Sequence, residues 1–406
     1  MIRIEEYASI VGQATIDELF LLARSLEGKV VQNINSTAVG GGVAEILTRI
    51  VPLLKQLGVD AHWDVIKGDE RFFVTTKKMH NGLHGTPVTL TKDELDAFIE
   101  INRVNAQELS FRDIVFIHDP QPIALVERRE GGRSHWIWRC HIDFSNPIES
   151  VWQFLEGYIH RYDVSVFSAP AFARSLEGKQ VLISPSIDPL SDKNRELPEN
   201  VIENIFKSFG IDRSRPIITQ ISRFDYLKDP LGVIQAYRMA KKNVDIQLVL
   251  AGGGATDDPE GPMVMQQVQD AAAKDEDIHV LFLPPASDIE INALQRGSTV
   301  VLQKSLKEGF GLTVSEALWK GRPVIASAVG GIPLQISHKY SGILTRSVQG
   351  TAHAIKQLIN EPEYARKLGI NGREHIKNNF LITRHIKDYL LLFISLFKNG
   401  RDIVYL

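Results

Sequence analysis

The chain has 406 residues, of which 44% are hydrophobic and 23% charged, and its formal net charge is −3. One core rarely grows beyond roughly 250 residues, so this length predicts two domains. The nearly balanced charge offers no bulk attraction to nucleic acid or to an anionic membrane, and we expect neither as a partner.

The single cysteine, Cys140, excludes an internal disulfide and a metal site built from several thiolates. Residues 1–20 carry acids where a secretory signal needs basic and then apolar residues. The most apolar stretch, 389–397, is much shorter than the roughly 20 residues that span a bilayer. We therefore expect a cytoplasmic protein.

Short β-rich runs alternate with amphipathic helical runs through the first half of the chain. This alternation predicts an α/β domain, in which helices cover a parallel sheet. Thr15 with Glu18, and Thr91 with Glu94, have the spacing of a capping box and predict two helix starts. The predicted strands are 29–36, 61–67, 113–119, 135–143, 164–169 and 180–184.

The polar segment 184–201 contains three prolines and predicts the linker to a second domain. A second strand–helix series follows, so we expect two doubly wound domains that face a cleft. Ligands of such folds bind at the carboxyl ends of the strands. The predicted strands of the second domain are 216–224, 245–253, 278–284, 298–305, 322–329 and 342–345.

The tail from Pro362 onward has a helical pattern, and its last segment, 382–400, is apolar on several faces. It could be the final core helix of the second domain. It could instead cross back and pack on the first domain, which is the interpretation we favour.

Gly40, Gly41 and Gly42 lie between the first predicted strand and an amphipathic helix. Glycine lets the backbone approach a ligand closely, and the start of a helix offers N–H groups to an anion. A diphosphate contact and a tight turn without a ligand explain this pattern about equally well.

Arg223 stands at the end of a predicted strand, and Lys228 stands five residues later, before a helix. Two cations at a strand end can neutralise a diphosphate leaving group, Arg through a planar fork and Lys as a mobile point charge. Exposed loop cations are the alternative, and the short interval favours the diphosphate site.

Gly252, Gly253 and Gly254 end another strand, and Asp257 and Asp258 follow them. These acids could ligate a metal, but adjacent acids after a glycine turn more often form a solvated loop. We predict no metal site and no required cofactor.

His118–Asp119 and His141–x–Asp143 both stand at strand ends of the first domain. A histidine near an aspartate can orient a hydroxyl group or receive its proton, so both pairs are candidate contacts to a polar substrate. Strand alternation turns Cys140 away from His141, which indicates a packing role for the thiol rather than a nucleophilic one.

Glu308 lies in the loop between a predicted strand and a helix, and Glu316 falls near the second turn of that helix. The amides of Leu312 and Thr313 would face a phosphate. Glu316 could accept the two hydroxyls of a ribose, and Glu308 could contact a sugar. Ordinary surface acids remain the alternative on composition alone.

Three of these segments together resemble the retaining glycosyltransferases of the GT-B fold. "EGFGLTVSE" (308–316) fits their E-x7-E signature, "SRFDYLK" (222–228) their diphosphate-binding pair, and "GGGVAEIL" (40–47) their N-domain glycine loop. The segments "NSTAVGGGVAEIL", "HDPQP", "WRCHID" and "PSIDPLSDKN" are similar to the branch of glycosyltransferring trehalose synthases and retaining trehalose phosphorylases.

The resemblance implies two Rossmann-like domains with a C-terminal helix that crosses back to the first. Residues 1–185 plus 381–406 would form the acceptor-side domain, and 186–380 the domain that binds the nucleotide sugar. The donor would be a nucleoside-diphosphate (NDP) glucose, the acceptor glucose and the product α,α-trehalose, in a reversible reaction. Relatives also suggest a homodimer, and Mg²⁺ would be at most an accessory.

The resemblance also implies residue roles. Arg223 and Lys228 would hold the diphosphate, Glu316 the ribose and Glu308 the donor glucose, and His141 would lie near the reacting centre. Further donor-side contacts would come from Gly41, Gly42, Gly309, Phe310, Gly311, Leu312 and Thr313. The candidates on the acceptor side are Asn35, His118, Asp119 and Asp143.

The resemblance implies retention of the anomeric configuration. No carboxylate is an evident nucleophile for double displacement, so we expect a front-face reaction. The nearest alternative is a retaining trehalose phosphorylase, in which phosphate replaces the nucleotide. A transferase of the same fold that makes sucrose or another glycan, and a catalytically silent sugar-nucleotide-binding protein, are the others. The sequence does not indicate the nucleobase.

Overall fold

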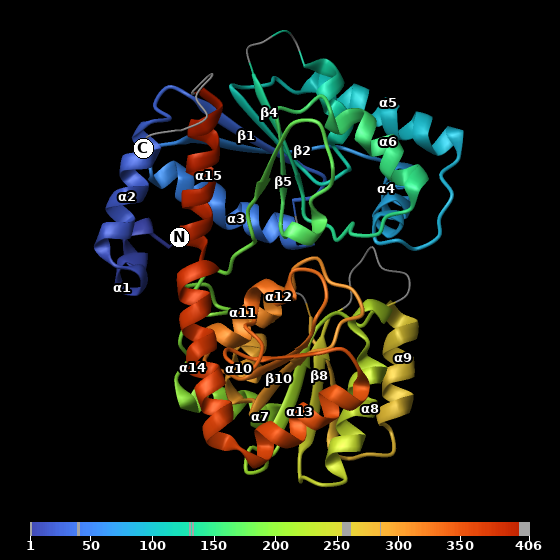
Figure 1. Ribbon diagram of the computed structural model, residues 1–406, viewed down its shortest axis with the longest axis vertical. Helices are drawn as coiled ribbons and strands as arrows, with labels where there is room; N and C mark the ends of the chain where they lie inside the picture. The colour runs from blue at the N-terminus through green and yellow to red at the C-terminus, as the bar shows by residue number, and fades with distance from the viewer. Residues whose placement is uncertain are drawn as a thin grey trace. The chain divides into compact units, whose positions relative to one another are not determined.

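The computed structural model describes residues 2–38, 41–129, 131, 134–253, 261–284 and 286–397. The chain divides into two compact units (Figure 1). Unit 1 is Met1–Pro185 with Ile382–Leu406, and unit 2 is Ser186–Leu381. The second boundary falls one residue later than we predicted, since Leu381 pairs with Ile187 of unit 2. The predicted cleft stays a prediction.

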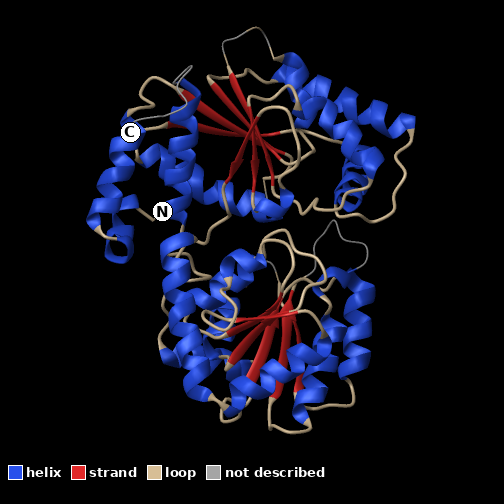
Figure 2. Cartoon of the chain, viewed as in Figure 1, coloured by secondary structure: helices blue, strands red, loops and turns tan. Residues whose placement is uncertain are grey.

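Unit 1 contains a parallel sheet in the order β2-β1-β3-β4-β5-β6. Every predicted strand is present. Strands β1, β3, β4 and β5 are almost wholly buried because helices cover both faces of the sheet, as Figure 2 shows. The strands are β1 (Val30–Asn35), β2 (Asp60–Val65), β3 (Ile114–His118), β4 (His135–Cys140), β5 (Val164–Phe167) and β6 (Lys179–Leu182).

One of the two predicted helix caps in unit 1 is confirmed. Thr91 caps α5 and forms a complete capping box with Glu94. Thr15 is not a cap, because α2 already begins at Gln13 and the Thr15 hydroxyl donates to the Val11 carbonyl. The helices of unit 1 are α1 (Ala8–Val11), α2 (Gln13–Arg24), α3 (Gly41–Gln56), α4 (Glu70–Leu83), α5 (Lys92–Glu108), α6 (Glu149–Ile159) and α15 (Ile382–Phe397), with 3₁₀ segments η1 (Ile4–Tyr7), η2 (Ile123–Arg128) and η3 (Pro170–Phe172).

The C-terminal helix α15 belongs to unit 1, so the predicted return to the first domain is confirmed and the alternative is wrong. The rings of Tyr389 and Phe393 pack on Phe116 of β3, with centroids 5.1 and 5.7 Å away. Lys387 forms an ion pair with Glu18 of α2, which lies beside α15 in Figure 1. The apolar character of the last segment therefore reflects burial against β3 and α2.

Unit 2 also contains a parallel sheet, in the order β12-β11-β10-β7-β8-β9, and again every predicted strand is present. The strands are β7 (Ile217–Ile221), β8 (Gln247–Gly252), β9 (Ile278–Phe282), β10 (Val300–Gln303), β11 (Val324–Ser327) and β12 (Ile343–Thr345). The helices are α7 (Glu199–Ser208), α8 (Pro230–Lys241), α9 (Gly261–Ala272), α10 (Asp288–Gly297), α11 (Leu312–Trp319), α12 (Ile332–Gln335), α13 (Val348–Asn360) and α14 (Pro362–Asn379), with the 3₁₀ segment η4 (Tyr226–Lys228).

The strand order of each sheet reverses at one point, between β1 and β3 in unit 1 and between β7 and β10 in unit 2. Loops that leave neighbouring strands at such a point run to opposite faces of the sheet and leave a crevice where ligands bind. Most of the predicted site residues follow these four strands. Among the described residues, no helix is both long and apolar enough to cross a bilayer.

Candidate active site

The two predicted cations of unit 2 occupy one short turn after β7. Arg223 is about half exposed, and its Nη2 lies 3.2 Å from the Asp225 carboxylate. The same carboxylate accepts a hydrogen bond from the Lys228 amide at 3.1 Å and caps η4. The Asp225 carboxylate therefore contacts both predicted cations. It meets the guanidinium of Arg223 and the backbone amide of Lys228.

Lys228 forms a largely buried ion pair with Glu308. Its Nζ lies 2.8 and 2.7 Å from the two carboxylate oxygens, and the two side chains are 16% and 10% exposed. Because β7 and β10 are neighbours in the sheet, the loops after them meet. The structure thus brings together two predicted site residues that are 80 positions apart.

Further side chains fix the Glu308 carboxylate. Its Oε2 accepts hydrogen bonds from Ser305 Oγ at 3.0 Å and from Gln303 Nε2 at 3.3 Å. Gln303 in turn accepts from the Thr313 hydroxyl at 2.8 Å, which links the carboxylate to the first turn of α11. Lys228, Gln303 and Ser305 therefore all donate to the Glu308 carboxylate and fix its position.

Glycines around Glu308 serve the loop itself. Gly311 has φ +79°, a left-handed conformation that favours glycine, and precedes α11. A Cβ on Gly330 would lie 1.6 Å from the Glu308 carbonyl oxygen. The Phe310 ring packs on Phe380, with centroids 5.6 Å apart. Backbone contacts of Gly309, Phe310 and Gly311 to a sugar stay a prediction.

Glu316 lies on the second turn of α11, as predicted, and is only 5% exposed. Its Oε2 accepts a hydrogen bond from Gln295 of α10 at 3.4 Å. Glu308 and Glu316 are therefore held by different partners, Lys228 in one case and Gln295 in the other. Leu312 and Thr313 form the first turn of α11, where amides lack an acceptor within the helix.

A third cation in this region escaped the sequence analysis. Lys304 follows β10 and forms a buried ion pair with Asp229. Asp229 adopts a left-handed conformation with φ +46° and caps α8 by accepting from the Gly232 amide. Lys304 stands at the end of a strand, as Arg223 does. This position in the sequence could have identified it as a candidate.

In unit 1, His118, the last residue of β3, contacts His141, which directly follows β4. His118 Nδ1 lies 3.3 Å from His141 Nε2, and the rings stack with centroids 5.6 Å apart. His118 Nε2 lies 3.1 Å from Asn33 Oδ1. Sequence analysis missed Asn33, although it shares a face of β1 with Asn35.

The two aspartates of the candidate pairs accept hydrogen bonds from nearby backbone and hydroxyl groups, and contacts of either pair to a substrate stay a prediction. Asp119 accepts from the His141 backbone amide at 2.7 Å. Asp143 accepts from the amide and hydroxyl of Ser145. A strand end turns adjacent side chains to different sides, so His118 meets a residue of the next strand rather than its own neighbour in sequence.

Burial controls the charge of this cluster. It lowers the pKa of His118 and of His141 well below the usual range, and the positive charge of Arg139 lowers both further. Burial raises the pKa of Asp119 to about 6, although the His141 amide and Arg139 oppose that shift. Both imidazoles are therefore neutral at pH 7.

Arg139 itself is wholly buried and was not predicted as part of the site. Its Nη2 donates to the Ile183 carbonyl at 3.0 Å, and its guanidinium lies 5.2 Å from the centre of the Tyr389 ring on α15. Burial lowers the pKa of Arg139. The C-terminal helix thus contributes to the surroundings of the cluster.

The remaining candidates of unit 1 lie around the end of β1. Asn35 accepts from Trp63 Nε1 at 2.8 Å and donates to the Thr37 carbonyl at 2.7 Å, so its amide helps to form the turn. Helix α3 begins at Gly41, and a Cβ on Gly42 would meet no atom within 4 Å. Gly40 lies outside the described residues.

Cys140 is buried, and burial raises the pKa of its thiol well above the usual range, which fits the predicted packing role. Within the described ranges, no three His, Cys, Asp or Glu side chains cluster so that they could hold a metal. Gly254, Asp257 and Asp258 lie outside those ranges. Whether the two acids ligate a metal or form a solvated loop therefore stays a prediction.

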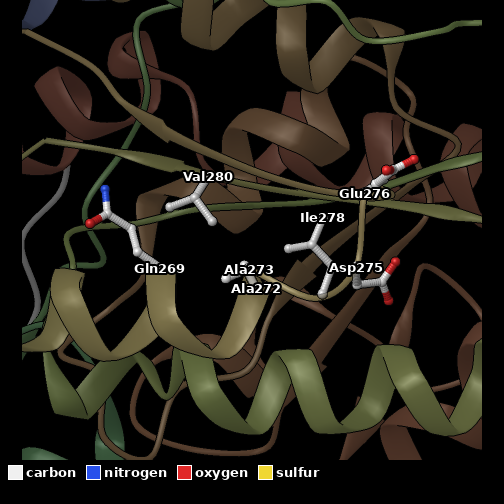
Figure 3. Close-up of a pocket in the computed structure, with 7 residues that line it drawn as sticks. All are labelled: Gln269, Ala272, Ala273, Asp275, Glu276, Ile278 and Val280. Carbon is white, nitrogen blue, oxygen red and sulfur yellow. The ribbon is translucent and has the colours of Figure 1, made fainter.

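A groove of about 290 Å³ in unit 2 is a separate feature (Figure 3). Its lining comes from the end of α9, the following turn and β9. Asp275, Glu276 and Ile278 stand at the amino end of β9, whereas Lys228 and Glu308 follow the carboxyl ends of β7 and β10. The groove therefore does not belong to the candidate site.

Comparison with known proteins identifies the family. A model of the trehalose synthase N-terminal domain matches residues 33–174, and a model of glycosyl transferases group 1 matches residues 201–375. A trehalose synthase from Rubrobacter xylanophilus is 45% identical over 403 residues, which cover 96% of each chain. The chain belongs to the trehalose synthase family.

Two further similarities of this trehalose synthase family member have lower sequence identity. A trehalose phosphorylase from Pleurotus pulmonarius is 32% identical, with 92% of this chain covering 58% of the phosphorylase. The structure of a UDP-forming α,α-trehalose-phosphate synthase from Burkholderia xenovorans, in complex with glucose 6-phosphate, superimposes with a TM-score of 0.72 at 11% identity. That alignment covers 90% of this chain and 100% of the other. The chain is a glycosyltransferase-family enzyme with the GT-B fold.

Proposed function

We propose that the protein is a retaining glucosyltransferase that makes α,α-trehalose reversibly from NDP-glucose and glucose. The observation that carries the proposal is the Lys228–Glu308 pair at the β7/β10 switch point, with Arg223 in the same turn. It joins a cation suited to a diphosphate and a carboxylate suited to sugar hydroxyls. The UDP-forming activity named for the Burkholderia relative supports a nucleotide donor.

Arg223 and Lys228 stabilise the negative charge that develops on the departing diphosphate. Glu308 accepts hydrogen bonds from the donor glucose, and Glu316 accepts them from the ribose. The bond between the anomeric carbon and the diphosphate oxygen breaks while the acceptor oxygen bonds to the same face of that carbon. The acceptor proton passes to the leaving diphosphate oxygen, so the reaction needs no protein nucleophile.

The acceptor is uncharged, and unit 1 offers neutral groups to it. His118 and His141 are neutral at pH 7 because they are buried. A neutral imidazole can both donate and accept a hydrogen bond, which suits a sugar hydroxyl. His141 is therefore the residue of unit 1 that we assign to glucose and, in the reverse reaction, to trehalose.

Product analysis tests the proposal. The protein is incubated with trehalose and UDP, with trehalose and ADP, and with trehalose and inorganic phosphate, and the sugar products are separated. We expect NDP-glucose and glucose in a nucleotide arm. Glucose 1-phosphate in the phosphate arm alone would make the protein a phosphorylase, and no turnover in any arm would favour a silent binding protein.

A panel of nucleotide sugars with glucose as acceptor then identifies the preferred base. We propose that Mg²⁺ is at most an accessory, so the rate of trehalose formation should survive EDTA. The anomeric configuration of the product, followed by NMR, tests retention.

A further inference from the structure

Gln220 lies within β7, and the proposed mechanism gives it no role. It is only 1% exposed, although glutamine is mostly an exposed residue. Its backbone belongs to the sheet, between Leu302 of β10 and Leu250 of β8. The amide of its side chain is not needed for the hydrogen bonds of the sheet, and a buried amide needs partners of its own. The burial of this side chain therefore calls for an explanation.

The Gln220 side chain joins the two loops that carry the candidate residues of unit 2. Its Nε2 donates to the Lys228 backbone carbonyl at 2.9 Å, in the turn after β7. Its Oε1 accepts from the Lys304 backbone amide at 2.9 Å, directly after β10. A longer contact of Nε2, at 3.4 Å, reaches Ser222 Oγ. One buried amide thus uses its donor on one loop and its acceptor on the other.

The two loops also contact each other directly. The Leu306 amide donates to the Leu227 carbonyl at 2.7 Å. In the first loop that bond lies one residue before Lys228, and the bond from Gln220 holds the next carbonyl. The backbone at Lys228 is therefore fixed against β7 itself and not only against the neighbouring loop.

Hydrogen bonds hold Lys228 at its amide, its carbonyl and its ammonium group. The Asp225 carboxylate accepts from the amide, Gln220 donates to the carbonyl, and Glu308 accepts from the ammonium. The first two contacts fix the backbone from which the side chain extends. Loss of the contact from Gln220 would leave the Lys228 carbonyl free to turn, and the ammonium would move with it.

We infer that Gln220 is a positioning residue, which keeps the Lys228 ammonium beside Glu308 and in place for the diphosphate of the donor. An amide offers a donor and an acceptor on one uncharged group, whereas an ionised carboxylate of the same shape offers acceptors alone. The inference rests on the proposed function, because it depends on the diphosphate contact assigned to Lys228.

A comparison of nucleotides that differ by one phosphate tests the inference. Dissociation constants of UDP and UMP, and of ADP and AMP, are measured by calorimetry on the wild type and on Gln220→Met. We expect the wild type to bind the diphosphate about a hundredfold more tightly than the monophosphate, because charge-assisted hydrogen bonds hold the terminal phosphate. Gln220→Met should lower this preference to about tenfold, since Arg223 remains in place.

Gln247→Met is the matched control. Gln247 is a buried glutamine of the same sheet, 2% exposed, and its Nε2 also donates to a backbone carbonyl, that of Asp212, at 2.6 Å. It stands at the amino end of β8, whereas Lys228 and Glu308 follow the carboxyl ends of their strands. Both variants should lower the melting temperature, but Gln247→Met should keep the full preference for the diphosphate.

A full preference that survives in Gln220→Met would overturn the inference. An equal loss of preference in Gln247→Met would also overturn it, because a general loosening of the sheet would then explain both variants. A wild type that binds monophosphate and diphosphate equally would remove the diphosphate contact, and the inference with it. A wild type that binds none of the four nucleotides would contradict the proposed function itself, which is a different outcome.

Gln220→Met leaves the Lys228 carbonyl and the Lys304 amide without their partner and could fail to fold. Gln220→Asn is the second variant, because it keeps an amide that can bind water but is one methylene too short to reach both loops. It should also lower the preference for the diphosphate to about tenfold. A preference within about twofold of the wild-type value would overturn the inference.

Discussion

The two units place their candidate residues at equivalent topological positions, but the residues of unit 2 are charged and the histidines of unit 1 are neutral. In unit 2, Lys228 and Glu308 carry opposite charges that pair at 2.7 Å. In unit 1, burial keeps His118 and His141 neutral. One doubly wound architecture thus supports paired charges in one unit and neutral hydrogen-bonding groups in the other. The difference comes from the side chains that follow the strands, not from the fold.

The largest effect should come from breaking the paired charges. Lys228→Met removes a leaving-group cation and leaves Glu308 largely buried without its countercharge. We expect turnover to fall about a thousandfold and the free energy of unfolding to fall by about 3 kcal/mol. Steady-state kinetics and urea unfolding measure these two quantities.

The double variant Lys228→Met/Glu308→Gln is the control for that experiment. It should recover most of the lost stability, because no charge remains unpaired, but none of the turnover. Wild-type turnover in Lys228→Met would remove the ion pair from the mechanism.

Arg223→Ala should separate activity from stability. The Arg223 side chain is 48% exposed, so its removal should leave the melting temperature unchanged. Turnover should fall about a hundredfold, because one stabilising contact to the diphosphate is lost. Arg366→Ala, at a side chain that is 66% exposed on α14, is the matched control and should change neither quantity. Normal turnover in Arg223→Ala would contradict the assignment of the leaving-group contact.

The neutral histidines of unit 1 predict sensitivity to acid. Burial holds the pKa of His118, His141 and His385 well below the ordinary value of 6.5. Below pH 6.5 the unfolded chain binds protons that the folded chain does not. The free energy of unfolding should therefore fall with decreasing pH by up to about 1.4 kcal/mol per pH unit for each histidine, and stay level above pH 7 with respect to these groups.

Urea unfolding between pH 4.5 and 7.5 measures this slope. His385→Phe should reduce it by the share of one histidine. An unchanged slope in His385→Phe would mean that this imidazole binds its proton as readily in the folded chain as in the unfolded chain.

The smallest effect concerns a helix start remote from either cluster. Thr91→Ala removes the capping box of α5 and should lower the free energy of unfolding by about 1 kcal/mol without a change in turnover. Thr15→Ala is the matched comparison, because Thr15 lies inside α2 and does not cap it. It should cost only a few tenths of a kcal/mol. Equal losses in thermal unfolding would show that the cap contributes nothing.

Much of the candidate site could be predicted because it is encoded locally. The position of Glu316 on the second turn of α11 follows from the strand before it and from Gly311 at the helix start. The pairing of Lys228 with Glu308 could not be predicted, since it depends on β10 lying beside β7 rather than beside β9, its predecessor in sequence.

The contact between His118 and His141 could not be predicted either. It joins side chains from the ends of two adjacent strands, 23 positions apart in the sequence. Lys320, which directly follows α11, was not singled out either, because its burial depends on a segment far away in the sequence. It is 6% exposed, and its Nζ donates to Asn194, 126 positions earlier.

By itself the sequence determined the alternation of strands and helices, the division into two units and the Thr91 cap, since each depends on residues within a few turns of one another. The tertiary structure decided which charges are paired and which groups are neutral. Those properties depend on strand order and on burial, which join residues as distant as Lys228 and Glu308 and remove them from water.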